Sequence, residues 1–377
     1  MKQNYFLPKL FVYYVCIVLL SNCKTPYEPP VQNEKQHFLV VEGFLNGNGL
    51  TTIKLSRTRN ITHGDSAAYI FEDGANVRIE DNSNDIYPLY NSGKGTYTGY
   101  LFANPSYLFR LHITTADNKE YLSDAVVFKP SPPIDQIGWK FRNGDVQVYA
   151  NTHDPQNSTR YYRWEYEETW EFHSEYYSFL EYDENSNSVK ARSVPVYQCW
   201  RFDNSSRILL GSSAKLKEDV INQAPIILIP FGDRKISVLY SILVTQYPLD
   251  SIGYNYWKAM ESNTENVGSI FDPQPNLTQG NIHCLTDSLE TVIGYIGAGT
   301  TQQSRLFISH ADMPSNWTQI AKCSEAIVPP DSLHWYFAQS GFDPVDYAAP
   351  PGNFLGASKT CVDCTLTGSP VKPAFWP

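Results

Sequence analysis

Short runs of alternating apolar and polar residues follow one another along the first third of the chain, and polar turns separate them. Residues 38–44 form an apolar run that ends at an Asn-Gly-Asn-Gly turn, residues 46–49, and residues 51–55 alternate beyond it. This order predicts a β-hairpin. The same pattern continues at short, regular spacing in residues 75–81, 95–97, 107–113 and 121–128. Repeated short strands predict a β-sandwich over residues 37–130.

A proline-rich segment, residues 130–133, interrupts this pattern because proline cannot donate a hydrogen bond to a β-ladder. A second series of strand-like segments follows, in residues 134–137, 146–150, 161–167, 226–229 and 236–244. These segments predict a second, fibronectin-like sandwich over residues 134–248, so we expect a mainly β chain with two sandwiches in tandem.

The densest aromatic segment of the chain, residues 161–182, contains ten aromatic residues interspersed with glutamates. Because side chains alternate across a strand, one face carries a row of aromatic rings. Two interpretations remain open for this row: the core face of the sandwich, or an exposed surface that stacks on a sugar or peptide. Its members are Tyr162, Trp164, Tyr166, Trp170 and Phe172.

The pattern changes after residue 248. Asp250 and Ser251 are typical of a helix N-terminus, and the spacing of Tyr254, Trp257 and Glu261 predicts a short helix that ends near Val267. Residues 291–298 and 305–310 predict two further strands, and the tail is rich in Pro, Gly and aromatic residues. We expect residues 249–377 to form one small closing part that disulfides hold together.

The N-terminus resembles an export signal. Lys2 and Lys9 precede an apolar run, residues 11–20, that is too short to span a bilayer. The sequence Leu-Ser-Asn-Cys ends this run and resembles a bacterial lipobox with Cys23 as the lipid-bearing residue. We therefore expect residues 1–22 to be a signal peptide and residues 23–36 an anchor and linker. The alternative is an ordinary signal peptide with a coincidental cysteine.

Composition and charge limit the classes of partner. The chain is 42% hydrophobic and 14% aromatic, with a net charge of −10. Removal of residues 1–22 leaves 27 basic and 39 acidic side chains, a balance of −12. Nucleic-acid binding needs clustered basic residues that neutralise phosphates, so this balance argues against it.

Five cysteines remain after the signal and the anchor are set aside: Cys199, Cys284, Cys323, Cys361 and Cys364. In an oxidising compartment they can form two bridges and leave one cysteine free. We expect Cys199 and Cys323 to pair with the two tail cysteines, in an order that the sequence leaves open. The CxxC spacing of the tail also permits a redox motif or half of a zinc site, but neither has its usual sequence context.

The known catalytic motifs are missing from the sequence. It contains no GxSxG, HExxH, Walker or GxGxxG motif in the required context. The His153-Asp154 pair and the pair of His310 with Asp312 have no nucleophile or second ligand at a known spacing, so we expect them to be loop residues. The glycines of residues 294–299 are more typical of close strand packing. We therefore expect no enzyme, no metal and no cofactor.

Several short motifs follow the lipobox in a fixed order. They are Leu-Val-Val-Glu-Gly at 39–43, Asp-Gly-Ala-Asn-Val at 73–77, Tyr256-Trp257, Gly-Asn-Ile at 280–282, Gly294-Tyr295, Cys-Val-Asp-Cys-Thr at 361–365 and Phe375-Trp376. The whole set resembles the DUF4249 family of Bacteroidota lipoproteins. This resemblance implies an outer-membrane lipoprotein, often encoded beside a TonB-dependent transporter, with an N-terminal domain similar to Ig-like or carboxypeptidase-regulatory sandwiches. It brings no catalytic residues.

Four Asp-Ser-apolar triplets resemble the acceptor for O-glycosylation of exported proteins in the same lineage. Their serines are Ser66, Ser251, Ser288 and Ser332. Asp-Ser also suits helix caps and turns, so modification is a hypothesis that the mass of the native protein tests.

These observations predict a lipid-anchored outer-membrane protein, exposed on the cell surface, that acts without catalysis as an accessory or ligand-capture partner of a TonB-dependent transporter. The anchor raises its local concentration at the membrane. An alternative is a structural or adhesive envelope protein that binds matrix or a neighbouring lipoprotein. A third is a hydrolase built from dispersed carboxylates. The sequence does not identify the ligand.

Overall fold

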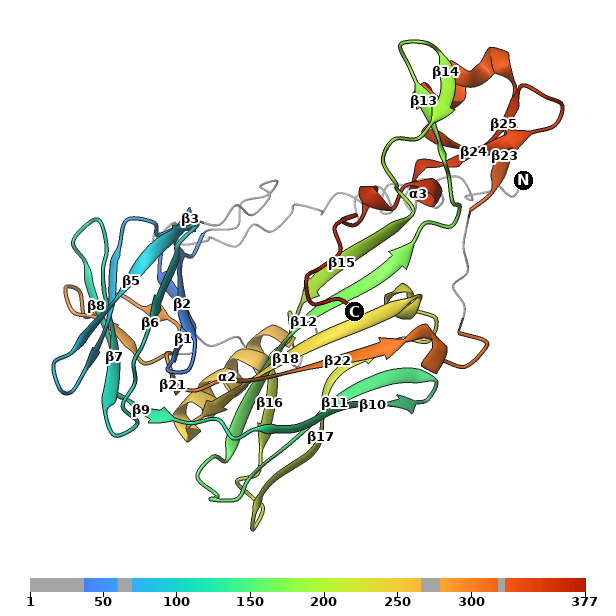
Figure 1. Cartoon of the computed structure of the whole chain (residues 1–377). Helices are drawn as coiled ribbons and strands as arrows, with labels where there is room; N and C mark the ends of the chain where they lie inside the picture. The colour runs from blue at the N-terminus through green and yellow to red at the C-terminus, as the bar shows by residue number, and fades with distance from the viewer. Residues whose placement is uncertain (1–36, 60–69, 266–278, 318–322) are drawn as a thin grey trace, which may run out of the picture.

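The computed structural model describes residues 37–59, 70–265, 279–317 and 323–377 of the chain. It is mainly β, and Figure 1 shows three parts: a barrel, a sandwich and a small C-terminal domain that we call the knob. Helix α2 (Ser251–Glu265) lies on the sandwich, on the side toward the barrel. Within the described residues, no helix has the length and apolar content that crossing a membrane requires.

The barrel is a closed ring of eight strands, not the open sandwich that the sequence predicted. The ring runs β7, β4, β5, β6, β2, β1, β21 and β9, and β9 pairs back with β7. Its strands are β1 (Leu39–Asn46), β2 (Leu50–Arg57), β4 (Asn76–Asp81), β5 (Ile86–Gly93), β6 (Thr96–Tyr100), β7 (Leu108–Thr114), β9 (Val126–Lys129) and β21 (Ala298–Gly299). Closure removes the unpaired edges that a sandwich would leave.

Segment 282–299 returns from the distant part of the chain to complete this barrel. Its strand β19 (Ile282–Cys284) pairs with β8 (Glu120–Ser123), and β20 (Val292–Ile293) pairs with β1. Strand β21 lies in parallel between β1 and β9. The single closing part predicted for residues 249–377 is therefore divided among the barrel, the sandwich and the knob, because main-chain pairing draws its middle segment back to β1.

The sandwich packs a three-stranded sheet against a five-stranded sheet around one apolar core. The first sheet contains β10 (Ile134–Arg142), β11 (Asp145–Asp154) and β17 (Asp219–Ile229). The second contains β12 (Tyr161–His173), β15 (Gln198–Asn204), β16 (Leu209–Ser212), β18 (Leu239–Leu249) and β22 (Gln302–Ser309). The first strand of the sandwich, β10, begins directly after the proline-rich segment.

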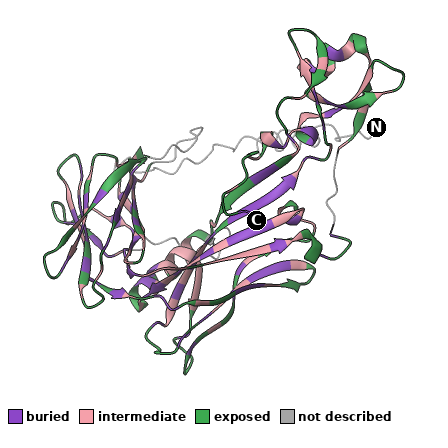
Figure 2. Ribbon diagram, in the orientation of Figure 1, coloured by how far each residue is buried: buried purple, intermediate pink, exposed green. Residues whose placement is uncertain are grey.

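The aromatic row of β12 belongs to this core, so its interpretation as a ligand surface is wrong. Tyr162, Trp164 and Phe172 are at most 1% exposed, and Tyr166 and Trp170 are below 9%. The three-stranded sheet covers the face on which they lie, and Figure 2 shows buried residues along β12 and β18. The opposite face of β12 is the one that contributes to a cleft.

The knob combines a hairpin from the middle of the chain with the C-terminal region. Its hairpin is β13 (Leu180–Asp183) and β14 (Ser188–Ala191), and its sheet is β23 (Glu325–Val328), β25 (Asn353–Ser358) and β24 (Phe342–Ala348). A contact of Tyr182 with Phe337 and an ion pair of 3.0 Å between Arg192 and Asp343 join the two segments.

Two disulfides hold the C-terminal part in place. Cys199 of β15 bonds Cys364, and Cys323 bonds Cys361, while Cys284 is buried and free. The four expected cysteines therefore form the two bridges, each with one tail cysteine. The final residues then lie along the sandwich, where the Nε1 of Trp376 donates to Glu171 at 3.0 Å.

Candidate ligand cleft between the barrel and the sandwich

Two cavities of the described surface have almost the same size. One, of about 690 Å³, lies on the barrel beside the returning segment. The other, of about 700 Å³, lies between the barrel, the outer face of the five-stranded sheet and helix α2. Their size is in the range of ligand sites, so the chemistry of the linings decides between them.

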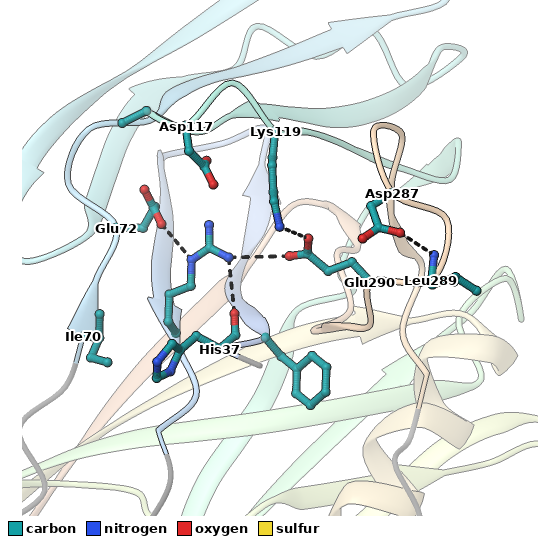
Figure 3. Close-up of a pocket in the computed structure, with 11 residues that line it drawn as sticks. His37, Ile70, Glu72, Asp117, Lys119, Asp287, Leu289 and Glu290 are labelled. Atoms are coloured by element: carbon teal, nitrogen blue, oxygen red, sulfur yellow. Dashed lines mark hydrogen bonds and ion pairs between the residues drawn. The ribbon is translucent and has the colours of Figure 1, made fainter. Parts of the chain in front are cut away.

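The cavity on the barrel contains charged groups that are already paired with one another (Figure 3). The Nε of Arg57 donates to Glu72 at 2.8 Å, and a terminal nitrogen lies 3.5 Å from Glu290. Glu290 also accepts from Lys119 at 2.5 Å and from the hydroxyl of Tyr121 at 2.6 Å. Glu290 precedes β20, so this network attaches the returning segment to the barrel.

The pKa shifts in this cavity agree with a structural network. Burial lowers the pKa of Arg57, but its hydrogen bond with Glu72 and nearby negative charge outweigh burial and raise that pKa. Burial and the hydrogen bond to Glu290 raise the pKa of Tyr121 well above its usual value. Arg57 therefore remains charged and Tyr121 neutral over the physiological range, and both are committed to partners within the protein.

The cleft between the domains has a floor and two walls from different elements. The floor is the outer face of the sheet, where Arg163 lies opposite Tyr247 and Glu165 lies opposite Thr245 in the register of β12 and β18. Outward-facing positions of β1 and β2 form one wall, including Glu42, Phe44, Leu50, Thr52 and Lys54. Tyr256, Trp257 and Met260 of α2 form the other.

Arg163 is the central charged group of the cleft. Its guanidinium lies 4.4 Å from the ring centre of Tyr247 and 4.5 Å from that of Trp257, so two aromatic faces hold it. It donates to Glu165, and no described residue accepts a hydrogen bond from its buried Nε. Burial and the nearby Glu165 raise the pKa of Tyr247, which keeps its hydroxyl neutral. The arrangement fixes a planar cation before any ligand arrives.

Helix α2 is fixed at the rim by contacts at its N-terminus. Asp250 accepts from the backbone nitrogen of Gly253 at 2.6 Å and from the hydroxyl of Tyr295 at 2.8 Å. The ring of Tyr295 stacks on Tyr256, with 5.6 Å between ring centres, and burial raises the pKa of Tyr256 to about 12. The predicted cap at Asp250 therefore anchors the helix that presents Trp257.

An apolar contact joins the β1 wall to the floor of the cleft. The rings of Phe44 in β1 and Tyr247 in β18 touch edge to face at 5.3 Å. Across the part of the chain that the structure describes, no group of three His, Cys, Asp or Glu residues is placed to hold a metal ion. Aromatic faces, a fixed arginine and nearby carboxylates suit the binding of a polar ligand of sugar or peptide size.

The other residues that the sequence singled out do not gather at one site. His153 pairs with Asp135 at 2.8 Å, and the Nδ1 of His310 lies 3.0 Å from the carbonyl of Ile236. Among the glycosylation candidates, Ser251 and Ser288 are exposed and Ser332 is half-buried. Cys23 and Ser66 lie outside the described residues.

The main residues of the cleft were missed by the search for motifs. Arg163, Tyr247 and Trp257 come from three segments, and only Trp257 was singled out from the sequence, as part of the predicted helix and as a mark of family resemblance. The alternation of β12 contained a usable signal, because it places Arg163 and Glu165 on the face opposite the aromatic row.

Comparison with known proteins places the cleft inside a shared region. A family model described as a domain of unknown function (DUF4249) matches residues 24–305, three quarters of the chain. All residues that line the cleft, from Val40 to Gln303, lie within that match, whereas the C-terminal part of the knob lies outside it. No curated protein matches the sequence.

Proposed function

The chain belongs to the DUF4249 family, and from this premise we propose that it is a non-catalytic ligand-capture lipoprotein of the outer membrane. It binds a polar ligand in the cleft between barrel and sandwich and acts beside a TonB-dependent transporter at the cell surface. The observation that carries the proposal is the guanidinium of Arg163, held between the rings of Tyr247 and Trp257 on the cleft floor.

The fixed arginine supports capture because a preorganised site loses little conformational entropy when a ligand binds. Its two aromatic neighbours are attached to different elements, β18 and α2, and Tyr247 also contacts the barrel through Phe44. A ligand that enters the cleft would therefore contact both domains. Segment 282–299 follows α2 in the chain and pairs with β1 and β9 of the barrel, so it holds the walls of this site together.

The proposed location is supported by the sequence at the N-terminus. The lipobox-like residues end at Cys23, and the aromatic and acidic composition suits an exported β protein. A lipid on Cys23 would attach the membrane to the barrel and not directly to the sandwich, since β1 is the first described strand after Cys23. The transporter partnership rests on what resemblance to the family implies.

Recovery of partners from membranes tests this proposal. An antibody against the native protein, applied to detergent-solubilised membranes, is expected to recover a TonB-dependent transporter together with the protein. The Cys23→Ser variant should no longer fractionate with the outer membrane. Recovery of the anchored protein without any transporter would contradict the partnership, and unchanged fractionation of Cys23→Ser would contradict the anchor.

A matched pair of variants tests the cleft. Trp257→Ala removes one of the two faces that hold Arg163, whereas Trp335→Ala removes a ring that is 56% exposed on the knob. We expect only Trp257→Ala to lower the amount of ligand that co-purifies, while both variants still recover the transporter. Equal ligand content in both variants would exclude the cleft as the binding site.

A further inference from the structure

One outer face of the barrel carries a group of exposed apolar side chains. Five large side chains on or next to β2, β5 and β6 are unusually exposed: Phe102 at 81%, Tyr90 at 69%, Tyr100 at 63%, Ile86 at 59% and Leu50 at 47%. We call these five residues the aromatic face. Isolated exposed apolar residues are ordinary on protein surfaces, but a contiguous group marks an interaction surface.

Strand register places four of these residues on the same side of the sheet, and Phe102 follows two positions after the end of β6. Leu50 of β2 lies directly opposite Tyr100 of β6, so their side chains are neighbours on the same side of the sheet. Tyr90 of β5 lies opposite Thr98, which precedes Tyr100 by two positions and faces the same way. Ile86 precedes Tyr90 by four positions and therefore also faces outward.

The segment that carries four of these five residues contains few charged side chains. Residues 86–102 include one charged side chain, Lys94, and it lies in the turn between β5 and β6. The protein as a whole carries a net charge of −10. Charged side chains border the aromatic face on the neighbouring strands, since Glu80 of β4 lies opposite Ile86 and Lys54 is on the same side of β2 as Leu50. The five residues themselves are uncharged, so a partner would contact them through apolar and ring surfaces.

We propose that the aromatic face rests on the surface of a lipid bilayer. This inference rests on the anchor of the proposed function. Leu39, where β1 begins, follows Cys23 by 16 positions, so the linker reaches about 55 Å at full extension. That reach exceeds the length of an eight-residue strand, about 27 Å, so the tether lets any side of the barrel reach the membrane.

Side-chain chemistry favours lipid over a second protein. Tyrosine and other aromatic rings concentrate at the level of lipid headgroups, where one end of the ring is apolar and the other is hydrated. None of the five residues is basic, so we do not expect their binding to require anionic lipid. Leu50 belongs both to the aromatic face and to the lining of the cleft, so docking holds the cleft beside the membrane surface.

Vesicle flotation tests the inference without the anchor. The mature chain carrying Cys23→Ser is mixed with phosphatidylcholine vesicles, with and without phosphatidylglycerol, at low and high salt. We expect it to float with both kinds of vesicle at either salt concentration. Combined replacement of Tyr100 and Phe102 by Ser should weaken partitioning about tenfold or more, because it removes two large apolar contacts.

Two further variants guard against indirect effects. Combined replacement of Trp335 and Tyr347 by Ser removes two exposed rings from the knob, and it should leave flotation unchanged. Tyr100→Trp should strengthen partitioning, since the larger ring has greater affinity for the interface. A protein that merely fails to fold cannot produce that gain.

The inference is overturned if the Cys23→Ser chain does not float, or if both double variants lose binding equally. It is also overturned if the aromatic-face variant floats normally but loses a co-purifying protein, because the occupant is then a protein surface. None of these results removes the proposed ligand capture, since ligand content and transporter recovery are measured on the anchored protein with the cleft intact.

Discussion

Replacement of Gly299 by alanine tests whether segment 282–299 closes the barrel. A Cβ atom at this position would lie 1.9 Å from the carbonyl oxygen of Lys129 in β9 and 3.3 Å from the ring of Phe44 in β1. Cβ contacts in real proteins do not come below 3.0 Å, so Gly299→Ala must separate β21 from β9 by at least about 1.1 Å.

The cost of this separation follows from the hydrogen bonds at the site. The nitrogen of Gly47 donates to the carbonyl of Gly299 at 2.8 Å, and the nitrogen of Thr300 donates to Lys129 at 3.1 Å. The nitrogen of Ser131 donates to the hydroxyl of Thr300 at 2.8 Å. Loss of two such bonds with partial burial of their unpaired groups costs about 2–4 kcal/mol of unfolding free energy.

Urea unfolding followed by circular dichroism measures that change. Tryptophan fluorescence is a useful contrast, because none of the eight tryptophans lies in residues 37–129 or 280–300. Hydrogen exchange of residues 126–131 should accelerate in Gly299→Ala. The control is Gly297→Ala in the same segment, where a Cβ meets only the ring of Phe44 at 3.2 Å. If both variants lose the same stability and residues 126–131 remain protected, closure by β21 is refuted.

Three further perturbations test the rest of the structure. Trp376→Ala removes an indole that donates to a buried carboxylate, and it should cost about 3–5 kcal/mol in urea unfolding followed by fluorescence. Replacing Cys323 and Cys361 by Ser opens a loop with a sequence separation of 38, worth about 4 kcal/mol, so limited proteolysis should degrade the knob first. Burial raises the pKa of Asp154, but hydrogen bonds from Gln156, Ser158 and Thr159 outweigh it and lower that pKa. Its stabilising effect is therefore present above the unfolded pKa near 3.9 and is lost as pH falls further. In Asp154→Asn, the unfolding free energy should therefore decrease less as the pH is lowered.

Each of these perturbations has a control within the chain. Val371→Ala changes a tail side chain that is 70% exposed, and Cys284→Ser changes the free cysteine. Asp203→Asn changes an exposed carboxylate. Equal unfolding midpoints for Trp376→Ala and Val371→Ala would contradict the role of the tail. Unchanged proteolysis of the cysteine variant would contradict the second prediction. An unchanged decrease of the unfolding free energy at low pH in Asp154→Asn would contradict the third.

Local periodicity predicted most strands, but it did not predict how they close. The alternation in β1, β2 and β4 is strong because one face of each strand is buried. Strand β21 has only two residues, Ala298 and Gly299, so it has no periodicity to detect. The glycines of residues 294–299 were expected to permit close packing, and at Gly299 this is confirmed, because a Cβ there would lie only 1.9 Å from the carbonyl oxygen of Lys129.

The cleft was harder to predict for a related reason. Alternation identifies the two faces of β12, but it does not say which face another layer covers. The three-stranded sheet covers the face of Trp164, which leaves Arg163 on the side of the cleft. Tyr247 and Trp257 approach Arg163 only after β18 and α2 fold against β12, so their juxtaposition depends on tertiary contacts that local sequence does not encode.

Native mass spectrometry of the protein released from its own membranes tests ligand capture in the cleft most directly. The wild-type protein is expected to carry a discrete additional mass beyond its covalent lipid and any glycan, and mild activation should release that mass. Trp257→Ala should lose it, whereas Trp335→Ala should retain it. If the wild-type protein and Trp257→Ala show the same ligand-free mass, or if all three carry the same releasable mass, the cleft is not a ligand site.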